Sequence, residues 1–383
     1  MAESRHHLLL VGVSTRALAQ SAVRAGYRVT AIDAFGDADL RAIAEVLPLD
    51  RASRRTGADA AALAARGVRA GLVAYTSNLD NHPAAVALLA RGRRLLGNTP
   101  DTLEQVRHPL RLAQALAARG FAVPAVRASA PAGRLPGAPW LRKPRRSGGG
   151  HGTARWRAGE PVGRGHYLQQ RIEGLPGSIV FAADGHRAVP LGLTRQLVGL
   201  RELGSYGFRY CGSLLASSGR PIFPRQAELH RRAVALAAAV TELFGLRGLN
   251  GLDFIARDGV PFPIEVNPRY SSSMELVERA SRLSLFTVHR DACRGRLPPP
   301  PLPAPDVVGK AIVFAPRALT VSNPAGWRVD LADVPHRGER IARGRPVCTV
   351  FGRGVSGAGC RSALIRAANA VYAALGDRAA GAA

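Results

Sequence analysis

The chain has 383 residues, of which 46% are hydrophobic and 21% charged, a composition typical of a globular protein of about two to three domains. No apolar run approaches the roughly 20 residues that cross a bilayer, and the N-terminal segment lacks the apolar core and cleavage site of a signal peptide. The four cysteines are far apart and form no CxxC pair, which argues against a zinc cluster and a disulfide framework. We therefore expect a cytoplasmic protein with reduced thiols and no membrane partner.

The formal net charge of +26 on its own favours a nucleic-acid partner. Of the 53 basic residues, however, 51 are arginine spread along the whole chain, and only Lys143 and Lys310 are lysine. Aromatic residues make up 5%, and no basic stripe interleaved with them forms a stacking platform for bases. We expect small anionic substrates rather than nucleic acid. A basic nucleotide- or RNA-binding protein is the non-enzymatic alternative.

Residues 1–100 predict an open α/β unit on parallel strands. HLLLVG is a continuous apolar run typical of a buried parallel strand; Ser14 is expected to cap the following helix and Gly26 to end it. Asp33, at the end of the second predicted strand, has the position of a ribose ligand in a dinucleotide site. The turn GVSTR, however, has one glycine where GxGxxG has three. We interpret the unit as a scaffold, and hydride transfer is disfavoured.

Residues 101–173 predict a linking helix followed by a small lobe of short strands. TPDTLEQVRHPLRLAQALAARG has an amphipathic pattern, with Asp101 and Glu104 in capping-box spacing and Gly120 at its end. Residues 174–295 predict a large lobe with a strand at SIVFAAD and a helix at HRRAVALAAAVTELFGL. The stiff segment RLPPPPLPAPD marks a boundary. Residues 306–383 then predict a small β-rich extension that ends in a helix and either covers the cleft or forms a dimer contact.

The most polar predicted hairpin lies in GLNGLDFIARDGVPFPIEVNPRYSSSMEL, residues 248–276. A three-residue loop with Gly259 in the left-handed conformation would place Asp253 opposite Glu265, on the face that also carries Asn267 and Arg269. Two carboxylates and an amide oxygen are hard ligands that suit Mg²⁺, or Mn²⁺ in its place, with phosphate oxygens as further ligands. Arg269 would neutralise charge on a transferred phosphoryl group.

A phosphate cradle is predicted upstream. Lys143 follows the predicted strand PWLR and precedes a loop made of Ser147, Gly148, Gly149, Gly150, His151 and Gly152. Successive glycine N–H groups can turn towards an anion, while a lysine ammonium adds a point charge and His151 a further donor. No GK[ST] follows the glycines, so this is not a Walker loop.

Three further side chains are candidates for binding a substrate. Asp80, in SNLDNHP, follows a predicted strand of the N-terminal unit, and Arg195 and Arg209 could each bind a carboxylate. The alternative for either arginine is an exposed, solvated side chain. Cys211 is interpreted as a small buried residue rather than a nucleophile.

Taken in chain order, these residues resemble the ATP-grasp superfamily, whose ligases clamp ATP between two α+β lobes. The resemblance spans roughly residues 8–284. GLNGLDF followed by IEVNPR is its most specific part and is similar to the carboxylate–amine ligase and carboxylase branch, which includes biotin carboxylase and carbamoyl-phosphate synthetase. The fold that it implies is an α/β pre-domain, two lobes that clamp ATP, and here a C-terminal β-rich extension.

The resemblance also implies roles for the residues. Asp253, Glu265 and Asn267 would hold one or two Mg²⁺ on the ATP phosphates, Arg269 would steady the transferred phosphoryl group, and Lys143 would contact the inner phosphates. The glycine loop, residues 147–152, would close over them. The hinge at the adenine would be formed by Gln169, Gln170, Arg171, Ile172 and Glu173.

The chain departs from the family pattern at two points. His108–Pro109, with Arg107 and Arg111 nearby, stand where the family often has a second ATP-binding lysine, and the hinge lacks the usual glutamate, for which Glu173 is a displaced candidate. The implied activity is ligation of a carboxylate to an amine through an acyl phosphate, with release of ADP and phosphate. An ATP-dependent carboxylase with a separate carrier, or a phosphotransferase, would use the same site. A homodimer is compatible with each of these activities.

Overall fold

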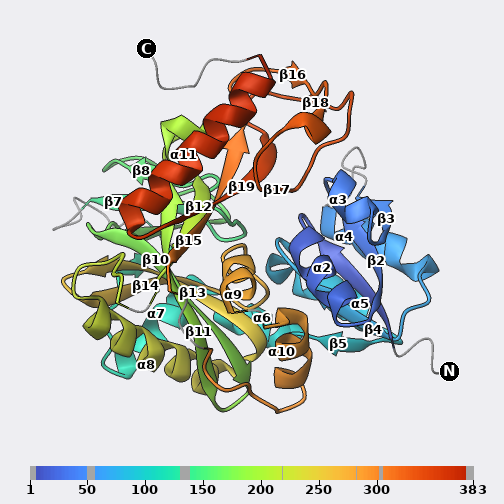
Figure 1. The fold of residues 1–383 in the computed structure, drawn as a ribbon. Coiled ribbons are helices and arrows are strands. Elements are labelled where there is room, and N and C mark those ends of the chain that lie inside the picture. The colour runs from blue at the N-terminus through green and yellow to red at the C-terminus, as the bar shows by residue number, and fades with distance from the viewer. Residues whose placement is uncertain are drawn as a thin grey trace.

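The structure is a computed structural model that describes residues 6–49, 57–129, 139–217, 219–281, 283–301 and 305–376. Over these residues the strands form sheets of five, eight, four and two strands. Figure 1 shows the N-terminal unit beside the large sheet, with helix α11 running along the opposite end of the molecule. In the part of the chain that is described, no helix is both long enough and apolar enough to span a membrane.

The N-terminal unit is a parallel sheet of order β3-β2-β1-β4-β5, which confirms the predicted open α/β unit. Its strands are β1 (His7–Gly12), β2 (Arg28–Asp33), β3 (Glu45–Pro48), β4 (Leu72–Tyr75) and β5 (Arg94–Leu96). Its helices are α2 (Arg16–Arg24), α3 (Ala38–Arg41), α4 (Gly57–Ala64) and α5 (Pro83–Ala90). Every residue of β1 is buried because β1 pairs with β2 and β4 on either side, which explains its continuous apolar run.

The predicted cap at Ser14 is wrong, because α2 begins after Thr15. The Thr15 side chain does not cap the helix either, since its hydroxyl donates to the Asp33 carboxylate at 2.8 Å. Asp33 also accepts from the backbone N–H groups of Thr15, Phe35 and Gly36. Asp33 therefore organises the loops at the ends of β1 and β2, as a scaffold residue would.

The predicted linking helix is two helices, α6 (Pro100–Val106) and α7 (Pro109–Ala118). Pro109 has no N–H to donate to a preceding turn, and it disfavours the helical conformation of His108. The helix is therefore interrupted between α6 and α7. The predicted capping box is also wrong: Thr99 caps α6 by accepting from the N–H of Thr102. The break turns Arg107, the residue just after α6, out of the helix and towards the rest of the molecule.

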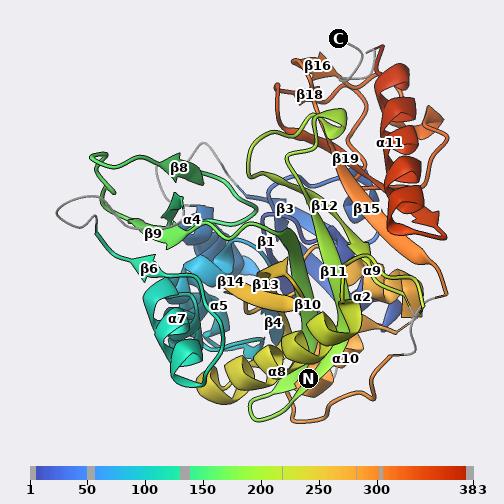
Figure 2. The same cartoon turned by 90° about the vertical axis from the view of Figure 1, so that its left-hand side faces the viewer.

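The small lobe is an antiparallel sheet of order β6-β9-β7-β8. Its strands are β6 (Val126–Arg127), β7 (Trp140–Pro144), β8 (Ala154–Trp156) and β9 (His166–Gln170). A separate core of Trp140, Trp156, Val162 and Leu168 holds it together. In Figure 2 this lobe projects away from the large sheet, beside α7 and the end of β14.

The large sheet has the order β14-β13-β10-β11-β12-β15-β19-β17. Its strands are β10 (Leu175–Asp184), β11 (Ala188–Val198), β12 (Tyr210–Leu215), β13 (Arg247–Arg257), β14 (Val260–Asn267), β15 (Val307–Phe314), β17 (Leu331–Ala332) and β19 (Pro346–Gly354). The helices are α8 (Gln226–Phe244), α9 (Met274–Ser281), α10 (Leu285–Ala292) and α11 (Gly357–Ala374). A short ribbon pairs β16 (Leu319–Thr320) with β18 (Arg340–Ile341), and 3-10 turns lie at Ala65–Gly67, Leu79–Asn81, Arg201–Leu203 and Pro324–Gly326.

Alternation along β10 divides the two faces of this sheet. Ile179 and Phe181 belong to the core beneath α8 and α11, whereas Val180 and Ala182 belong to a core shared with α9, α10 and the N-terminal unit. Tyr27 of the N-terminal unit packs edge-on against Phe286 of α10, with ring centroids 4.8 Å apart. The N-terminal unit is therefore docked by apolar burial onto the large sheet.

The C-terminal extension is β-rich, as predicted, but it is not a separate β-unit. β15 pairs antiparallel with β12, so Gly212 stands opposite Ala311, and β19 and β17 follow it in the same sheet. This pairing carries Lys310 to the middle of the molecule, where it is 3% exposed.

Candidate active site

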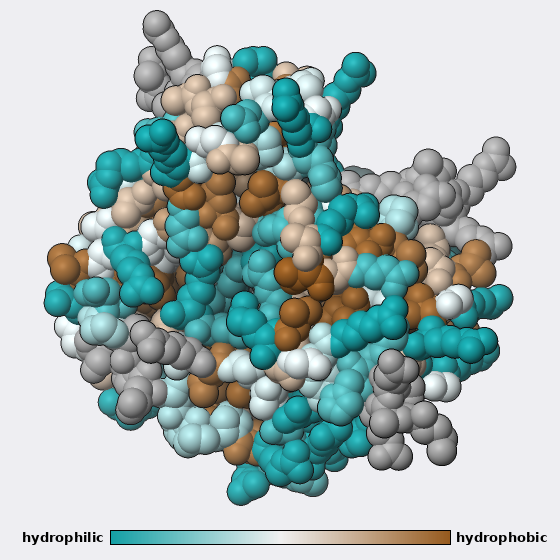
Figure 3. Space-filling model, turned by 45° about the vertical axis from the view of Figure 1, so that its right-hand side comes forward, coloured by the Kyte–Doolittle hydropathy of each residue, from teal (hydrophilic) through white to brown (hydrophobic). Residues whose placement is uncertain are grey.

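A cavity of about 1130 Å³ lies where the N-terminal unit, the small lobe, the large sheet and the C-terminal extension meet. Pockets that hold one small molecule commonly have volumes of about 300–1,000 Å³, so this one has room for a nucleotide and a second ligand. Figure 3 shows hydrophilic side chains scattered across the visible face of the molecule, with hydrophobic groups between them, rather than gathered along one stripe.

The β13–β14 hairpin brings its two acids together in the way that the sequence predicts, but by a different turn. The loop has two residues, Asp258 and Gly259, both with positive φ, instead of the predicted three. With a two-residue loop and regular pairing along the hairpin, Asp253 would not stand opposite Glu265. A β-bulge between Asp253 and Phe254 shifts the register and places Asp253 directly opposite Glu265.

Asp253, Glu265 and Asn267 all line the cavity, and the Asn267 amide donates to Asp253 Oδ2 at 3.1 Å. Burial and the neighbouring negative charge of Glu265 raise the pKa of Asp253 to about 7, although side-chain hydrogen bonds from Ser178, Gln196 and Asn267 oppose the rise. A divalent cation between the two carboxylates would remove this repulsion, because opposite charge favours the ionised form. The donor set thus fits Mg²⁺. No group of three or more His, Cys, Asp or Glu side chains forms a metal site within the described ranges.

Arg269 is 9% exposed, and a residue of the N-terminal unit, Asp80, holds its side chain in place. It donates to Asp80 Oδ1 at 2.8 Å and to Asn267 Oδ1 at 3.1 Å. The backbone before it is fixed as well, because Tyr75 Oη and Asn98 Nδ2 both donate to the Pro268 carbonyl. Arg269 therefore orients the Asn267 amide while it lines the cavity.

Sequence reasoning noted Arg107 only as a neighbour of a missing lysine, yet it is central to the site. Its guanidinium donates to the Val266 carbonyl at 2.9 Å, to the Ser147 carbonyl at 2.9 Å and to Asn81 Oδ1 at 2.8 Å, and it lies 3.4 Å from Glu265 Oε2. One side chain thus joins the glycine loop, the hairpin face that carries Asp253 and Glu265, and the N-terminal unit. The sequence signal that could have identified Arg107 is Pro109, because a proline disfavours continuation of the helix through the residues just before it.

Lys143 and the whole glycine loop line the same cavity, apart from Gly152. Lys143 Nζ donates to Gln169 Oε1 at 3.1 Å, and Gln169 Nε2 reaches the Ile264 carbonyl at 3.4 Å, so the small lobe is tied to β14. Positive φ at Gly149, Gly150 and Gly152 requires glycine there. The loop packs on the start of β12, because the Tyr210 N–H donates to the Gly149 carbonyl at 3.0 Å.

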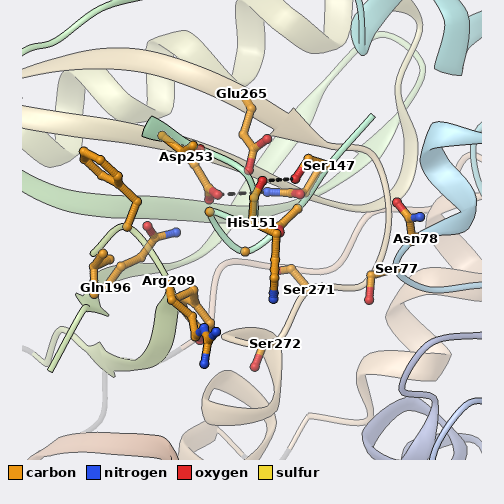
Figure 4. Close-up of a pocket in the computed structure, with 18 of the residues that line it drawn as sticks. Ser77, Asn78, Ser147, His151, Gln196, Arg209, Asp253, Glu265, Ser271 and Ser272 are labelled. Carbon is orange, nitrogen blue, oxygen red and sulfur yellow. Dashed lines mark hydrogen bonds between the residues drawn. The ribbon is translucent and has the colours of Figure 1, made fainter. Parts of the chain in front are cut away.

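His151 lies in this loop with its Nδ1 2.9 Å from the Gly148 carbonyl, while Ser147 Oγ donates to the His151 carbonyl at 2.6 Å. Figure 4 shows Asp253 and Glu265 on their strands close to Ser147 and His151, with Arg209 across the pocket. The hinge residues all line the cavity as well: Gln169, Gln170, Arg171, Ile172 and Glu173.

The three substrate candidates have different surroundings. Arg209 lines the cavity, donates to the Gly344 carbonyl at 2.9 Å and lies over the Phe314 ring. Arg195 does not line the cavity, because side chains alternate along β11 and its neighbour Gln196 faces the cavity instead. The Arg195 guanidinium reaches the Ile222 carbonyl. Asp80 is 1% exposed; burial would raise its pKa, but Arg269 and Arg107 hold the pKa below the usual value. Cys211 is buried, as predicted.

A second group of charges, which sequence reasoning did not identify, lies where the N-terminal unit meets the C-terminal extension. Arg16 and Lys310 both donate to the Glu275 carboxylate, and Arg16 also donates to Asp333 Oδ1 at 2.9 Å. Burial alone would raise the pKa of Glu275, but the two cations lower it well below its usual range. Of these residues, Arg16, Lys310 and Asp333 line the cavity.

Comparison with known families agrees with this geometry. Residues 108–273, from α7 to the loop after β14, match the family model of the ATP-grasp domain. The chain carries an ATP-grasp domain. The resemblance seen in the sequence is therefore confirmed, and the matched residues of this domain include Lys143, the glycine loop and the acids of the hairpin.

An uncharacterized protein from Methanocaldococcus jannaschii is 26% identical over 125 residues, which are 33% of this chain and 31% of that protein. The chain thus matches about a third of the length of this curated relative. This likeness, restricted to part of both proteins, adds no activity.

Solved structures show that the whole chain has the ATP-grasp fold. Pyruvate carboxylase from Rhizobium etli superposes with a TM-score of 0.72 at 17% identity, over 95% of this chain and 37% of that one. N5-carboxyaminoimidazole ribonucleotide synthetase from Thermus thermophilus gives 0.67 at 19% identity, over 97% and 99%. L-amino acid ligase from Bacillus licheniformis gives 0.67 at 15% identity, over 95% and 97%.

Proposed function

We propose that the protein is an ATP-dependent ligase that joins a carboxylate to an amine and releases ADP and phosphate. One observation carries the proposal: Asp253, Glu265 and Asn267 share one face of a hairpin, inside a cavity that also contains Lys143 and the glycine loop. Such an arrangement suits a nucleotide with its phosphates at the acids, and the likeness to ligases and carboxylases supports it.

Mg²⁺ is the metal that fits the donor set, and Asp253, Glu265 and Asn267 would hold it. When bound, it would neutralise charge on the ATP phosphates. The N–H groups of the glycine loop and the ammonium of Lys143 would bind the phosphate oxygens, and the hinge from Gln169 to Glu173 would accommodate the adenine. The described contacts of Arg107 would keep the loop beside the acids.

The reaction proceeds in two displacements. A carboxylate oxygen of the acid substrate attacks the γ-phosphorus, the bond to the β-phosphate bridging oxygen breaks, and ADP leaves. The amine binds as an ammonium and first gives up one proton to solvent; its neutral nitrogen then attacks the carbonyl carbon of the acyl phosphate, phosphate leaves, and the nitrogen releases a second proton to solvent. Arg269 steadies the transferred phosphoryl group and orients Asn267, and Arg209 binds the acid, since its guanidinium lies on the cavity wall.

ADP release over a panel of carboxylic acids crossed with amines tests this function. We expect ADP only when a matching acid and amine are both present, together with Mg²⁺. Asp253→Asn and Glu265→Gln should abolish the release while the far-UV circular dichroism stays unchanged. Unchanged turnover in either variant contradicts the proposal.

Bicarbonate is a second candidate for the acid, because the similar structures include pyruvate carboxylase and N5-carboxyaminoimidazole ribonucleotide synthetase. The same assay distinguishes the two possibilities. ADP release that depends on bicarbonate but not on any organic acid would favour a carboxylase, and dependence on an organic acid would favour the ligase.

A further inference from the structure

One end of the cavity is more acidic than the rest of this strongly basic protein. Helix α2, the loop after β2 with α3, the start of α9, β15 and the segment after β17 meet here. They bring together four carboxylates, Asp37, Asp39, Glu275 and Asp333, with two cations, Arg16 and Lys310. The acids exceed the cations here although the chain as a whole carries a charge of +26.

Three of the four carboxylates have partners within the protein. Glu275 accepts from Arg16 and Lys310, and Asp333 accepts from Arg16 and from Thr349 Oγ1 at 2.6 Å. Asp39 accepts from the N–H groups of Asp333 and Val334 at 3.0 and 3.1 Å. These acids are fixed to the protein and are not available to a ligand.

Asp37 is the exception. It is 8% exposed and lines the cavity, but among the described residues no hydrogen-bond donor and no ion-pair partner contacts its carboxylate, and it does not cap α3. Burial, together with the charges of Asp333, Asp33 and Asp39, raises the pKa of Asp37 to about 8, although the positive charge of Arg16 opposes the rise. A buried carboxylate among other acids is costly unless a cation joins it, so the position calls for positive charge from a ligand.

We propose that Asp37 binds a protonated amine of the second substrate, with the ammonium as donor and the carboxylate as counter-ion. This inference rests on the proposed function in that it assigns the amine substrate to this end of the cavity. An ammonium suits the position better than Mg²⁺, because only one carboxylate is free and a magnesium site needs several oxygen ligands. Val13, Ala17, Phe35 and Ile312 line the cavity as well and would contact the carbon skeleton of the amine.

Amine binding can be measured without ATP turnover, as a shift of the unfolding temperature at pH 7. The probes are butylamine and phenethylamine, compared with butanol, phenethyl alcohol and butyrate, which have similar skeletons without the positive charge. At least one amine should stabilise the wild type, because a ligand that binds only the folded state raises the unfolding temperature. The alcohols and butyrate should give no comparable shift.

Asp37→Asn should weaken amine affinity by about tenfold or more, since it removes one partner of a buried ion pair. Asp37→Ser is a second variant that retains a residue favoured at the position just before α3, the N-cap. Asp101→Asn, an exposed acid in the first turn of α6, is the matched control and should behave as the wild type. Stabilisation by alcohols or butyrate equal to that by the amines, no stabilisation by either amine, or full stabilisation of both Asp37 variants would each overturn the inference.

The inference and the proposed ligase fail in different ways. If no acid–amine pair releases ADP but amine binding still depends on Asp37, the ligase is wrong and the amine site stands. If an acid–amine pair does release ADP, and Asp37→Asn leaves the KM of the amine unchanged, the ligase stands and Asp37 is not its amine site.

Discussion

The two ends of the cavity differ in how their charges are satisfied. At the end proposed to bind the nucleotide, Asp253 and Glu265 face each other, and Lys143 has only the neutral Gln169 as its hydrogen-bond partner in the described structure. At the other end, Arg16, Lys310, Glu275 and Asp333 form ion pairs with one another, and only the nearby Asp37 has no such partner among the described residues. Groups with unsatisfied charge are suited to bind a charged ligand, whereas a satisfied network mainly holds the protein together. We therefore expect substitutions at the two ends to affect different properties.

The largest effect is expected at the paired acids. Asp253→Asn or Glu265→Gln should lower the rate of ADP release by about a thousandfold or more, because the metal and the phosphates lose a ligand. Thermal unfolding should show no loss of stability, since either change removes the repulsion that raises the pKa of Asp253. A variant that unfolds at a much lower temperature would show that these acids have a structural role instead.

At the other end of the cavity, we expect substitutions to lower the unfolding free energy of the protein. Glu275→Gln leaves Arg16 and Lys310 buried without their shared carboxylate and should cost about 3–5 kcal/mol of unfolding free energy in urea titrations. Glu202→Gln is the control, because its pair with Arg361 is partly exposed and should contribute less than about 1 kcal/mol.

The same network gives a pH dependence. The pKa of Glu275 is lower in the folded state than its usual value of 4.5, so the network stabilises the protein above that pH and loses its contribution as the pH falls below it. The difference in unfolding free energy between the wild type and Glu275→Gln should therefore shrink in acid. A difference that stays constant from neutral pH to well below pH 4.5 would contradict this assignment.

Arg107→Ala removes the buried cation that contacts both the Ser147 carbonyl and the Glu265 carboxylate. The glycine loop should then no longer be held beside the acids, and the KM for ATP should rise by about a hundredfold. Arg111→Ala removes an exposed arginine one turn further along and should have little effect. Equal effects of the two substitutions would mean that only the loss of positive charge matters.

The smallest effect is expected within the loop itself. A Cβ at Gly150 would overlap the Phe208 carbonyl oxygen, and its φ is +77°, so Gly150→Ala should raise the KM for ATP by about tenfold. Gly148→Ala is the matched comparison, because no atom lies near its Cβ position and its φ is not positive. If both variants bind ATP equally well, the packing of the loop on the chain before β12 is not needed for ATP binding.

The sequence by itself determined the parts of this protein that depend on short-range pattern. The apolar run of β1 predicted the buried strand, and the order of residues around Lys143 and Asp253 predicted the ATP-grasp fold and the pairing of Asp253 with Glu265. The fold was implied by the resemblance of these motifs to a known family. The pairing was predicted from side-chain alternation and was right, although the predicted three-residue loop was not.

Only the tertiary structure decided the rest. The contacts of Arg107 with the glycine loop and β14, and the joining of β15 to β12, each depend on segments that are distant in the chain. The charge network is the clearest case, because Arg16, Glu275, Lys310 and Asp333 are far apart in the chain and meet only when the N-terminal unit docks on the large sheet. The sequence shows which residues carry charge, but whether a charge is buried, paired or free depends on which distant residues surround it, as Asp37 illustrates.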